Sequence, residues 1–562
     1  MTASRAAVLS RNLLALSEDP ALVEAIRAAA PDPRIEVRWA RDGSPVPVVR
    51  SAQGELPLHS LFAPGREAAK LHGAVAGGGY LVFQGLGAGY QISPFLEDPD
   101  TFAALVIEKD AGILRALLES IPLEHVLSDR RCRLVVGTAG IRGVIVSSYQ
   151  PVLAGALRTL PLRPWCETER AFFTAAARET EAALRDIQAD FSVQAHFGKR
   201  WFSNMLLNLE TAQVAGAELP RADRAAVTAA GPSLTRQARA VGDASREGMV
   251  VATDTSFPTL LRLGVMPGVV LSIDCQVHSY RHFLGSRPVA APLILDLASP
   301  PALARLAPNH AFFASQHPFS RYLCRRWRRF PLLDVTGGNV TYAAVNLARA
   351  LGARTIRLFG ADFSYPRGTP YARGSYLFDL FDGTAGRVHP LECQLFGMLF
   401  RSPDVQKERL PQGIRYTTPL LIGYRERLLT LMASMDAVVT SEPGDGLPIP
   451  ASGPSSVRAG PPPEWFAPPP VSCDWKELLR TYRAEVLSLP ALGAGWGAAA
   501  QTTHRSDADT LATLLPVAAT VIRERERSGL AGGTLDRAAV LEASRAWILG
   551  RVTRALSDGG AL

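Results

Sequence analysis

The sequence lacks any long apolar segment. It contains no uninterrupted apolar run of 18 or more residues in its 562 positions, whereas a transmembrane helix needs about 20 such residues. Residues 1–5 also lack the apolar core of a secretory signal. We therefore expect no membrane span and a cytoplasmic location.

Cysteine is scarce as well. The six cysteines lie far apart, and no two of them form a Cys-x-x-Cys pair. This pattern supports neither a zinc knuckle nor a disulfide framework, and it fits a reducing compartment. Neither sign of charge dominates, because 60 Lys and Arg residues face 52 Asp and Glu residues. The net charge of +8 favours anionic ligands, from nucleotides to acidic proteins, and does not specify nucleic acid.

The composition is that of a globular protein, 47% hydrophobic and 20% charged, with room for two or three domains. We expect an α/β fold, with late strands of its first domain at residues 133–136 and 143–147. Five parts are expected. They are a Rossmann-like N-terminal domain (1–165), connecting helices (166–217), a central α/β domain with a mostly parallel sheet (218–448), a linker rich in Pro and Gly (449–472) and a helical C-terminal domain (473–562).

The N-terminal domain contains a glycine-rich turn. A strand at residues 80–83 leads into Gly-x-Gly-x-Gly at residues 85–89, and the strand at 104–107 ends at Glu108. This spacing imitates a dinucleotide or S-adenosylmethionine site, with a carboxylate for the ribose. The alternative is a Rossmann-like supporting domain that keeps the turn for packing. The glycines alone do not decide between them.

In the central domain, short apolar runs are followed by polar residues. Runs at 225–230, 249–253, 269–273 and 355–359 have the composition of buried parallel strands. The polar groups that follow them are Ser233, Asp254 with Thr255, Asp274, and Asp362. Because ligands of open α/β sheets bind just outside the carboxyl ends of the strands, these groups are predicted to surround a ligand.

The turn after the first run is Gly231-Pro232-Ser233. Gly231 allows a tight turn and a close approach of a ligand, and Pro232 suits the first turn of a helix. Ser233 offers a hydroxyl and a backbone N–H at the positive end of that helix, where phosphate binds readily. The alternative is an ordinary strand-to-helix turn without a ligand.

Two further segments of the central domain carry polar groups. Gly337, Gly338 and Asn339 precede a helix and are predicted to form a nest of backbone donors. The loop after the last strand contains Asp362, Tyr365 and Tyr376, interleaved with Pro and Gly, and such a loop is suited to lie over a sugar nucleotide.

A tyrosine hydroxyl in that loop can stabilise a departing phosphate oxygen. His389, farther along the chain, is a candidate general base. The alternative is that His389 is structural.

The central motifs resemble those of a known family. Residues 227–234, 253–256, 272–274, 337–340 and 360–365 look like the motility accessory factors, which are flagellin glycosyltransferases with nonulosonic acid donors. The helix at 196–208 and the turn at 84–90 resemble the N-terminal region of the same family. Its central domain carries the label of the archaeal 6-hydroxymethylpterin diphosphokinases (MptE-like), and its motifs are similar to those of bacterial sialyltransferases that use CMP-sialic acid.

The resemblance implies roles for these residues. Gly231, Pro232 and Ser233 would hold the nucleotide, and Asp254 and Asp274 stand where the sialyltransferases have asparagines. Two carboxylates would repel an anionic nucleotide unless they are protonated, hydrogen-bonded or bridged by a metal. The two tyrosines that support the leaving phosphate would correspond to Tyr376 and, less directly, to Tyr365 or its neighbour Ser364, and the histidine base to His389.

The leading hypothesis is a glycosyltransferase that moves a nonulosonic acid from a CMP-activated donor to Ser or Thr of flagellin. No cofactor or bound metal is expected, and the expected partners are flagellin and the nucleotide sugar. One alternative is a pterin diphosphokinase, in which Asp254, Asp274 and Asp362 hold Mg²⁺ for ATP. Another is a flagellin-binding factor without catalysis.

Overall fold

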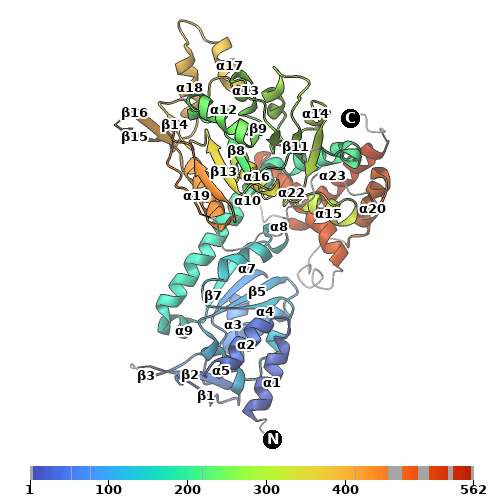
Figure 1. The fold of residues 1–562 in the computed structure, drawn as a ribbon. Helices are drawn as coiled ribbons and strands as arrows, with labels where there is room; N and C mark the ends of the chain where they lie inside the picture. Colours follow the sequence, from blue (N-terminus) through green and yellow to red (C-terminus); the bar gives the residue numbers. More distant parts are fainter. Residues whose placement is uncertain are drawn as a thin grey trace. The chain divides into compact units, whose positions relative to one another are not determined.

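The computed structural model describes residues 4–51, 54–75, 78–217, 219–411, 413–453, 471–490, 505–529 and 536–557. The predicted linker at 449–472 lies for the most part outside the described residues. The chain divides into two compact units (Figure 1). Unit 1 comprises Met1–Gly198 and Ser488–Trp547, and unit 2 comprises Lys199–Leu487 and Ile548–Leu562. None of the described helices has the length and apolar character needed to cross a membrane.

Unit 1 contains a parallel four-stranded sheet and an antiparallel three-stranded sheet. Its strands are β1 (Ile35–Trp39), β2 (Pro45–Ser51), β3 (Gly54–Pro57), β4 (Gly79–Gln84), β5 (Thr101–Glu108), β6 (Cys132–Val136) and β7 (Leu157–Pro161). Its helices are α1 (Arg5–Ala15), α2 (Pro20–Ala28), α3 (Pro64–Ala74), α4 (Ser93–Glu97), α5 (Ala111–Ser120), α6 (Glu124–Leu127), α7 (Ile141–Ser148), α8 (Pro151–Ala154), α9 (Arg163–Thr168), the first part of α10 (Arg170–Val214), α22 (Arg505–Arg527) and most of α23 (Arg537–Ser557).

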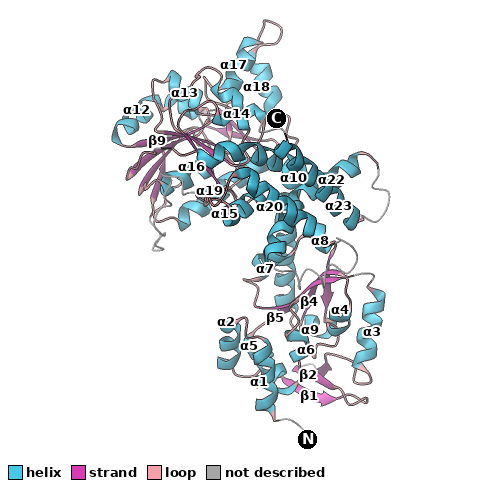
Figure 2. Cartoon of the chain, turned by 90° about the vertical axis from the view of Figure 1, so that its right-hand side faces the viewer, coloured by secondary structure: helices cyan, strands magenta, loops and turns pink. Residues whose placement is uncertain are grey.

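The parallel sheet of unit 1 has the order β6-β5-β4-β7, and helices cover both of its faces (Figure 2). Successive side chains of β4 point to opposite faces. Leu81 and Phe83 pack in the core with α1 and α5. Tyr80 and Val82 pack in a second core, with α7 and α10. This three-layer arrangement is that of the Rossmann-like domain predicted from the sequence.

One expected strand of this domain is wrong. Residues 143–147 belong to helix α7, because the buried positions Ile141, Ile145 and Tyr149 are spaced by four residues and share one helical face. The fourth strand is instead β7, which pairs with β4 at the edge of the sheet. β7 ends in Pro161, which an edge strand tolerates.

Unit 2 is built on a seven-stranded parallel sheet with a small antiparallel sheet beside it. Its strands are β8 (Arg224–Thr228), β9 (Met249–Thr253), β10 (Val269–Ser272), β11 (Leu293–Asp296), β12 (His310–Phe313), β13 (Thr355–Phe359), β14 (Tyr365–Pro366), β15 (Gln406–Leu410), β16 (Gly413–Thr417) and β17 (Val438–Ser441). Its helices are α11 (Ser233–Arg236), α12 (Ala238–Glu247), α13 (Phe257–Arg262), the 3₁₀ helix η1 (Val277–Phe283), α14 (Pro301–Ala304), α15 (Pro318–Arg326), α16 (Val340–Ala350), α17 (Tyr376–Gly383), α18 (Leu391–Leu399), α19 (Pro419–Ser434) and α20 (Trp475–Ser488).

The order of the large sheet fixes the place of a ligand site. The strands lie in the order β12-β11-β10-β9-β8-β13-β17. The chain therefore proceeds outward from β8 to β12 and then returns to β13, on the other side of β8. This reversal makes the carboxyl ends of β8 and β13 the topological switch point, where open α/β sheets bind ligands. The predictions of an α/β fold, of mostly parallel sheets and of C-terminal helices are confirmed.

The second half of α10 supports the loops that follow β10 and β11. The side-chain amide of Asn204 donates to the carbonyls of Cys275 (3.0 Å) and Ala298 (2.8 Å). That of Asn208 donates to the carbonyls of Leu297 (2.8 Å) and Ser299 (2.9 Å). Both amides satisfy main-chain acceptors, so their role is to fix the loops at the carboxyl edge of the sheet.

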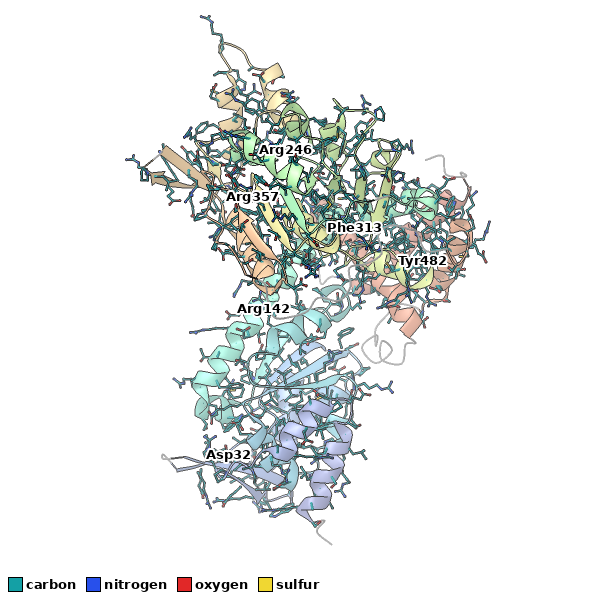
Figure 3. All side chains as sticks on the ribbon, viewed as in Figure 1. Asp32, Arg142, Arg246, Phe313, Arg357 and Tyr482 are labelled. Atoms are coloured by element: carbon teal, nitrogen blue, oxygen red, sulfur yellow. The ribbon has the colours of Figure 1, made fainter. Side chains whose placement is uncertain are left out.

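The helices predicted beyond residue 473 are divided between the units, with α20 in unit 2 and α22 in unit 1. Tyr482 of α20, labelled in Figure 3, is fully buried and lies 5.1 Å from the ring of Phe319 and 4.9 Å from that of Tyr322. The Tyr322 hydroxyl donates to Glu485 (2.9 Å). These aromatic contacts hold α20 against α15.

Candidate functional site

The turn at Gly231, Pro232 and Ser233 joins β8 to α11 at the switch point, and its donors have partners within the protein. The Gly231 N–H donates to the carbonyl of Gly360 (2.9 Å). The Ser233 N–H and hydroxyl donate to the two carboxylate oxygens of Asp362 (2.8 and 2.6 Å). A Cβ on Gly231 would lie 2.4 Å from Asp362, so the close approach that requires this glycine is made by a carboxylate of the chain itself.

Asp362 follows β13 and is almost fully buried. Burial raises the pKa of its carboxyl group, and the two hydrogen bonds from Ser233 oppose this shift. The segment after β17 closes over the pair, because the Asp445 N–H donates to the Ser233 hydroxyl (3.1 Å) and the Leu447 N–H to the Asp362 carbonyl (2.8 Å). The structure thus joins Ser233 and Asp362 as one hydrogen-bonded pair, whereas the sequence predicted that both face a ligand.

Asp254 lies at the carboxyl end of β9, where it is buried. Its carboxylate accepts hydrogen bonds from the N–H and hydroxyl of Thr255 (2.7 and 3.0 Å) and from the hydroxyl of Ser272 (2.7 Å), at the end of β10. The carboxyl ends of these two neighbouring strands are therefore joined by a side-chain hydrogen bond. The hydrogen bonds disperse the charge of Asp254, which reduces its repulsion of an anion.

Asp274 follows β10 and accepts a hydrogen bond from the Gln276 N–H (2.9 Å). Burial raises the pKa of its carboxyl group, and the nearby Asp254 adds to the shift, while His282 and Arg200 oppose it. The second carboxyl group at this edge is therefore held in its neutral form to a higher pH than usual.

His282, at the end of η1, is a site residue that the sequence interpretation missed. Its ring lies edge-on to that of Tyr376, with 4.9 Å between centroids. Both Asp254 and Asp274 lie close enough to act electrostatically on it. Nδ1 of His282 is buried without a hydrogen-bond partner. The signal in the sequence is its position eight residues after Asp274. The 3₁₀ helix η1 shortens this distance, and without knowledge of that helix the spacing carries no weight.

Tyrosines from the loop after β13 complete the cluster. Burial raises the pKa of Tyr371 to about 12, and the adjacent Tyr365, Tyr376 and Asp254 contribute to the shift. The loop is fixed to the turn at the switch point, because the Ala372 N–H donates to the Ala230 carbonyl (2.9 Å). Tyr365 and Tyr376, both predicted, therefore lie in the same region as Asp254, with Tyr371 between them.

The predicted nest at Gly337, Gly338 and Asn339 lies at the start of α16. The side chain of Asn339 caps the helix by accepting the Tyr342 N–H (3.0 Å). A Cβ on Gly338 would lie 3.0 Å from the ring of Tyr424. Because Tyr424 is also close enough to Tyr371 to act on its pKa, this segment borders the tyrosine cluster.

His389 is the one predicted site residue whose position is unlike the others. It lies in the turn between α17 and α18, is exposed, and exchanges main-chain hydrogen bonds with Gly386 (3.0 and 3.1 Å). Its neighbour Val388 is 91% exposed. No contact of the His389 side chain with the strand-end cluster is observed among the described residues.

The glycine turn of unit 1 is filled by side chains of the protein. A Cβ on Gly85 would lie 2.8 Å from Trp165, and one on Gly87 would lie 2.4 Å from His59. His59 accepts the Ala88 N–H (3.0 Å), and Glu108 accepts the Leu86 N–H (3.1 Å) and the Trp165 indole N–H (2.8 Å). The carboxylate expected to bind a ribose is thus fully buried in protein contacts, which favours the supporting-domain alternative.

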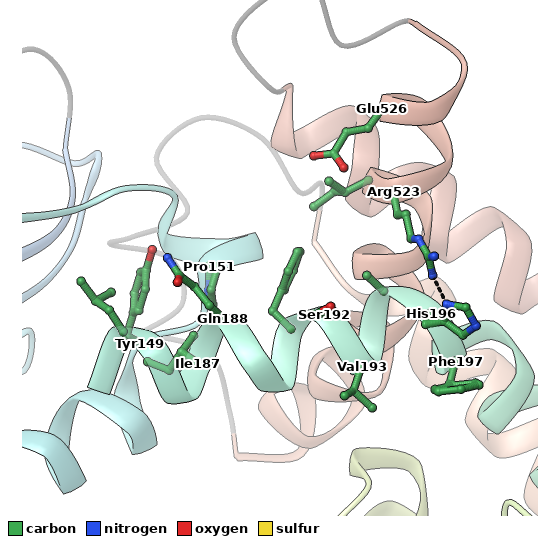
Figure 4. A pocket seen from close by; sticks show the side chains of 14 residues that line it. Tyr149, Pro151, Ile187, Gln188, Ser192, Val193, His196, Phe197, Arg523 and Glu526 are labelled. Atoms are coloured by element: carbon green, nitrogen blue, oxygen red, sulfur yellow. Dashed lines mark hydrogen bonds between the residues drawn. The ribbon is translucent and has the colours of Figure 1, made fainter. Parts of the chain in front are cut away.

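Unit 1 also contains a cavity of about 680 Å³ between α10, α22 and the α7–α8 corner (Figure 4). Its walls are mostly apolar, with Ile187 and Phe191 on α10 and Ile522 on α22. At one end Arg523 donates to Nδ1 of His196, as the dashed line in Figure 4 marks. None of the residues predicted to form the site lines this cavity.

Three comparisons relate the chain to known proteins. Residues 200–368 match the family model described as 6-hydroxymethylpterin diphosphokinase MptE-like. An uncharacterized protein of Treponema pallidum (strain Nichols) is 34% identical over 171 residues, which are 28% of this chain and 79% of that protein. A second uncharacterized protein of the same organism is 36% identical over 174 residues, 29% of this chain and 61% of that protein.

Among solved structures, the MAf glycosyltransferase from Magnetospirillum magneticum AMB-1 matches 99% of this chain, and the match covers 95% of the solved chain. The TM-score is 0.55 and the sequence identity 16%. At this identity the match shows a shared fold. The MptE-like central domain predicted from the sequence is confirmed, and the likeness to a motility accessory factor extends over almost the whole chain as fold.

Proposed function

We propose that this chain is a glycosyltransferase that uses a nucleotide-activated sugar. The chain belongs to the same family as the first of these Treponema pallidum proteins, and its central part matches the MptE-like family model. The fold shared with a MAf glycosyltransferase supports this proposal. The observation that carries it is the cluster of Asp254, Asp274, His282 and Tyr376 at the carboxyl ends of neighbouring strands, beside the switch point of the sheet. The donor is a CMP-activated nonulosonic acid, and the acceptor is a Ser or Thr hydroxyl of flagellin.

The donor lies along the carboxyl edge of the large sheet. The turn at Gly231, Pro232 and Ser233 forms the floor of this site, held by Asp362, and the tyrosine loop covers it. Asp254 with Thr255 and Asp274 border the nucleotide, and the segment Gly337, Gly338 and Asn339 borders it near Tyr424. These positions are supported by the hydrogen bonds that join the strand ends and the loop.

The reaction is attack of the acceptor hydroxyl on the anomeric carbon, with CMP as the leaving group. Tyr376, at the start of α17, and Tyr365, in β14, donate hydrogen bonds to the departing phosphate. A hydrogen bond aimed at developing charge typically contributes about 10²–10³-fold to the rate constant. A histidine takes the acceptor proton, and the chain offers His389 and His282 for this step.

Titration with nucleotides tests the proposal. The wild-type protein is titrated calorimetrically with CMP and, separately, with ATP and Mg²⁺, and Ser233→Ala is compared with it. The proposal expects CMP binding that weakens in Ser233→Ala, since the variant removes the hydroxyl that joins Asp362 to the Asp445 main chain. Thr430→Ala, an exposed hydroxyl on α19 that donates to the Glu426 carbonyl, is the control. A protein that binds neither nucleotide contradicts the proposal and supports a flagellin-binding factor without catalysis.

The description of the matching family model favours a second candidate, a diphosphokinase that binds ATP and Mg²⁺. It would use Asp254, Asp274 and Asp362 as ligands. The described part of the chain contains no group of three or more His, Cys, Asp or Glu side chains placed to hold one metal ion, and both oxygens of Asp362 accept hydrogen bonds from Ser233. Tight ATP binding that depends on Mg²⁺, without CMP binding, would establish this candidate instead.

A further inference from the structure

His282 is held in place at the strand ends from several sides. It is the second-last residue of η1, which begins three residues after Asp274, and its ring meets that of Tyr376 on α17 at an interplanar angle of 74°. Asp254 at the end of β9 and Asp274 at the end of β10 both act on it electrostatically. Arg200 of α10 also acts electrostatically on Asp274. The imidazole is therefore fixed beside the tyrosine assigned to the leaving phosphate.

The two nitrogens of this ring differ in their surroundings. Nδ1 is enclosed by the protein and has no hydrogen-bond partner, and no described residue forms a hydrogen bond with the imidazole. A buried polar atom left without a partner is uncommon and marks a place where a substrate, a water molecule or a change of charge completes the interaction. Because Nδ1 is buried, Nε2 is the nitrogen that remains to meet a ligand.

The charge state of His282 suits a base. Burial lowers its pKa, and the carboxyl groups of Asp254 and Asp274 oppose that shift. The ring is consequently neutral at neutral pH and able to accept a proton. Once it is protonated, the same two carboxyl groups stabilise the imidazolium. This combination is the one that a general base requires, and the exposed turn of His389 does not provide it.

We infer that His282, and not His389, is the general base of the transfer. This inference rests on the proposed function. Nε2 of His282 takes the proton of the acceptor hydroxyl while the acceptor oxygen bonds to the anomeric carbon. The bond between that carbon and the phosphate oxygen breaks, and CMP leaves with the electron pair. The imidazolium then releases its proton to water, so atoms and charge balance over one turnover.

Matched substitutions test the assignment in the full-length chain. His282→Asn and His282→Gln are compared with His389→Asn and His389→Gln. Transfer from a CMP-activated nonulosonic acid to purified flagellin is followed by the mass of the acceptor, and CMP affinity is measured by calorimetry. We expect kcat to fall about 10²–10⁴-fold in both His282 variants, the range of a general base. The dissociation constant for CMP and the melting temperature stay near the wild-type values, and both His389 variants transfer at wild-type rates.

The pH profile provides the second readout. In the wild type kcat falls as pH decreases through the pKa of His282, which burial places below the ordinary value for histidine. The residual rate of His282→Asn lacks this acidic limb. If His282 had only a structural role, its substitution would leave the fall of kcat at low pH unchanged.

Three results overturn the assignment. Loss of transfer in the His389 variants, with normal rates in the His282 variants, would show that His389 is the general base. Loss of CMP affinity together with transfer in His282→Gln makes His282 a donor-binding residue and leaves the proposed function standing. A wild type that binds CMP but transfers no sugar to flagellin contradicts the proposed function itself, and the base assignment with it.

Discussion

Two sheets of this molecule carry a glycine-containing turn at the end of a strand, and they use it differently. In unit 1 the turn after β4 is packed by His59, Trp165 and the buried Glu108, so the glycines make room for the protein's own side chains. In unit 2 the turn after β8 is closed by Asp362, but the neighbouring strand ends carry Asp254, His282 and the tyrosines. A glycine turn alone therefore does not distinguish packing from binding, and the groups at the neighbouring strand ends, among them His282 with its unpartnered Nδ1, have to be considered with it.

The largest expected effect is on catalysis in unit 2. Tyr376→Phe removes the hydroxyl assigned to the leaving phosphate, so kcat for transfer is expected to fall about 10²–10³-fold with little change in CMP affinity. Tyr280→Phe is the matched control, because Tyr280 lies on η1 and its hydroxyl accepts a hydrogen bond from Arg287 (2.9 Å). Equal rates for Tyr376→Phe and wild type would remove Tyr376 from the mechanism.

The next effect is a pH dependence of stability in unit 1. Burial lowers the pKa of His59 to about 4 in the folded state, against about 6.5 in the unfolded chain. Between these values the unfolded chain binds more protons, so His59 destabilises the folded state as pH falls from about 6.5 to 4, by up to about 3 kcal/mol. Chemical denaturation of wild type and His59→Asn is measured across this range. A difference between the two proteins that does not change with pH would show that His59 is not buried as a neutral group.

A backbone substitution sharpens the contrast between the turns. Gly87→Ala places a Cβ 2.4 Å from His59 at a positive φ of 52°, so we expect a loss of about 2 kcal/mol in stability with unchanged CMP affinity. Gly73→Ala in α3, where a Cβ meets no atom within 4 Å, is the control and is expected to be neutral or slightly stabilising. Urea denaturation gives the stabilities. Loss of CMP binding in Gly87→Ala at full stability would move the ligand site to unit 1.

The smallest effect concerns the pair that closes the turn of unit 2. Asp362→Asn replaces the carboxylate that accepts both donors of Ser233, and the cost is expected to be about 1–2 kcal/mol. Asp379→Asn breaks only the exposed ion pair with Arg262 and serves as the control, with less than about 1 kcal/mol expected. If the two substitutions have the same effect on thermal unfolding, the Ser233–Asp362 pair is not a structural link.

Much of the fold could be predicted because its strands are short, apolar and buried on both faces. The prediction of a strand at residues 143–147 is wrong, because a brief apolar run shows no helical period until its buried neighbours Ile141 and Tyr149 are known. Of the site, the polar strand ends Asp254 and Asp274 were predictable from the position of each after its strand. His282 was not, because the 3₁₀ helix that returns it to the strand ends has no distinctive pattern. The partner of Ser233 was not predictable either, as Asp362 is 129 residues away.

A structure of the protein with CMP bound is the decisive measurement. We expect one CMP at the carboxyl edge of the seven-stranded sheet, with its phosphate within hydrogen-bond distance of the Tyr376 hydroxyl and beside the ring of His282. A CMP bound instead at the glycine turn of unit 1, with the side chains of His59 and Trp165 displaced, would contradict it.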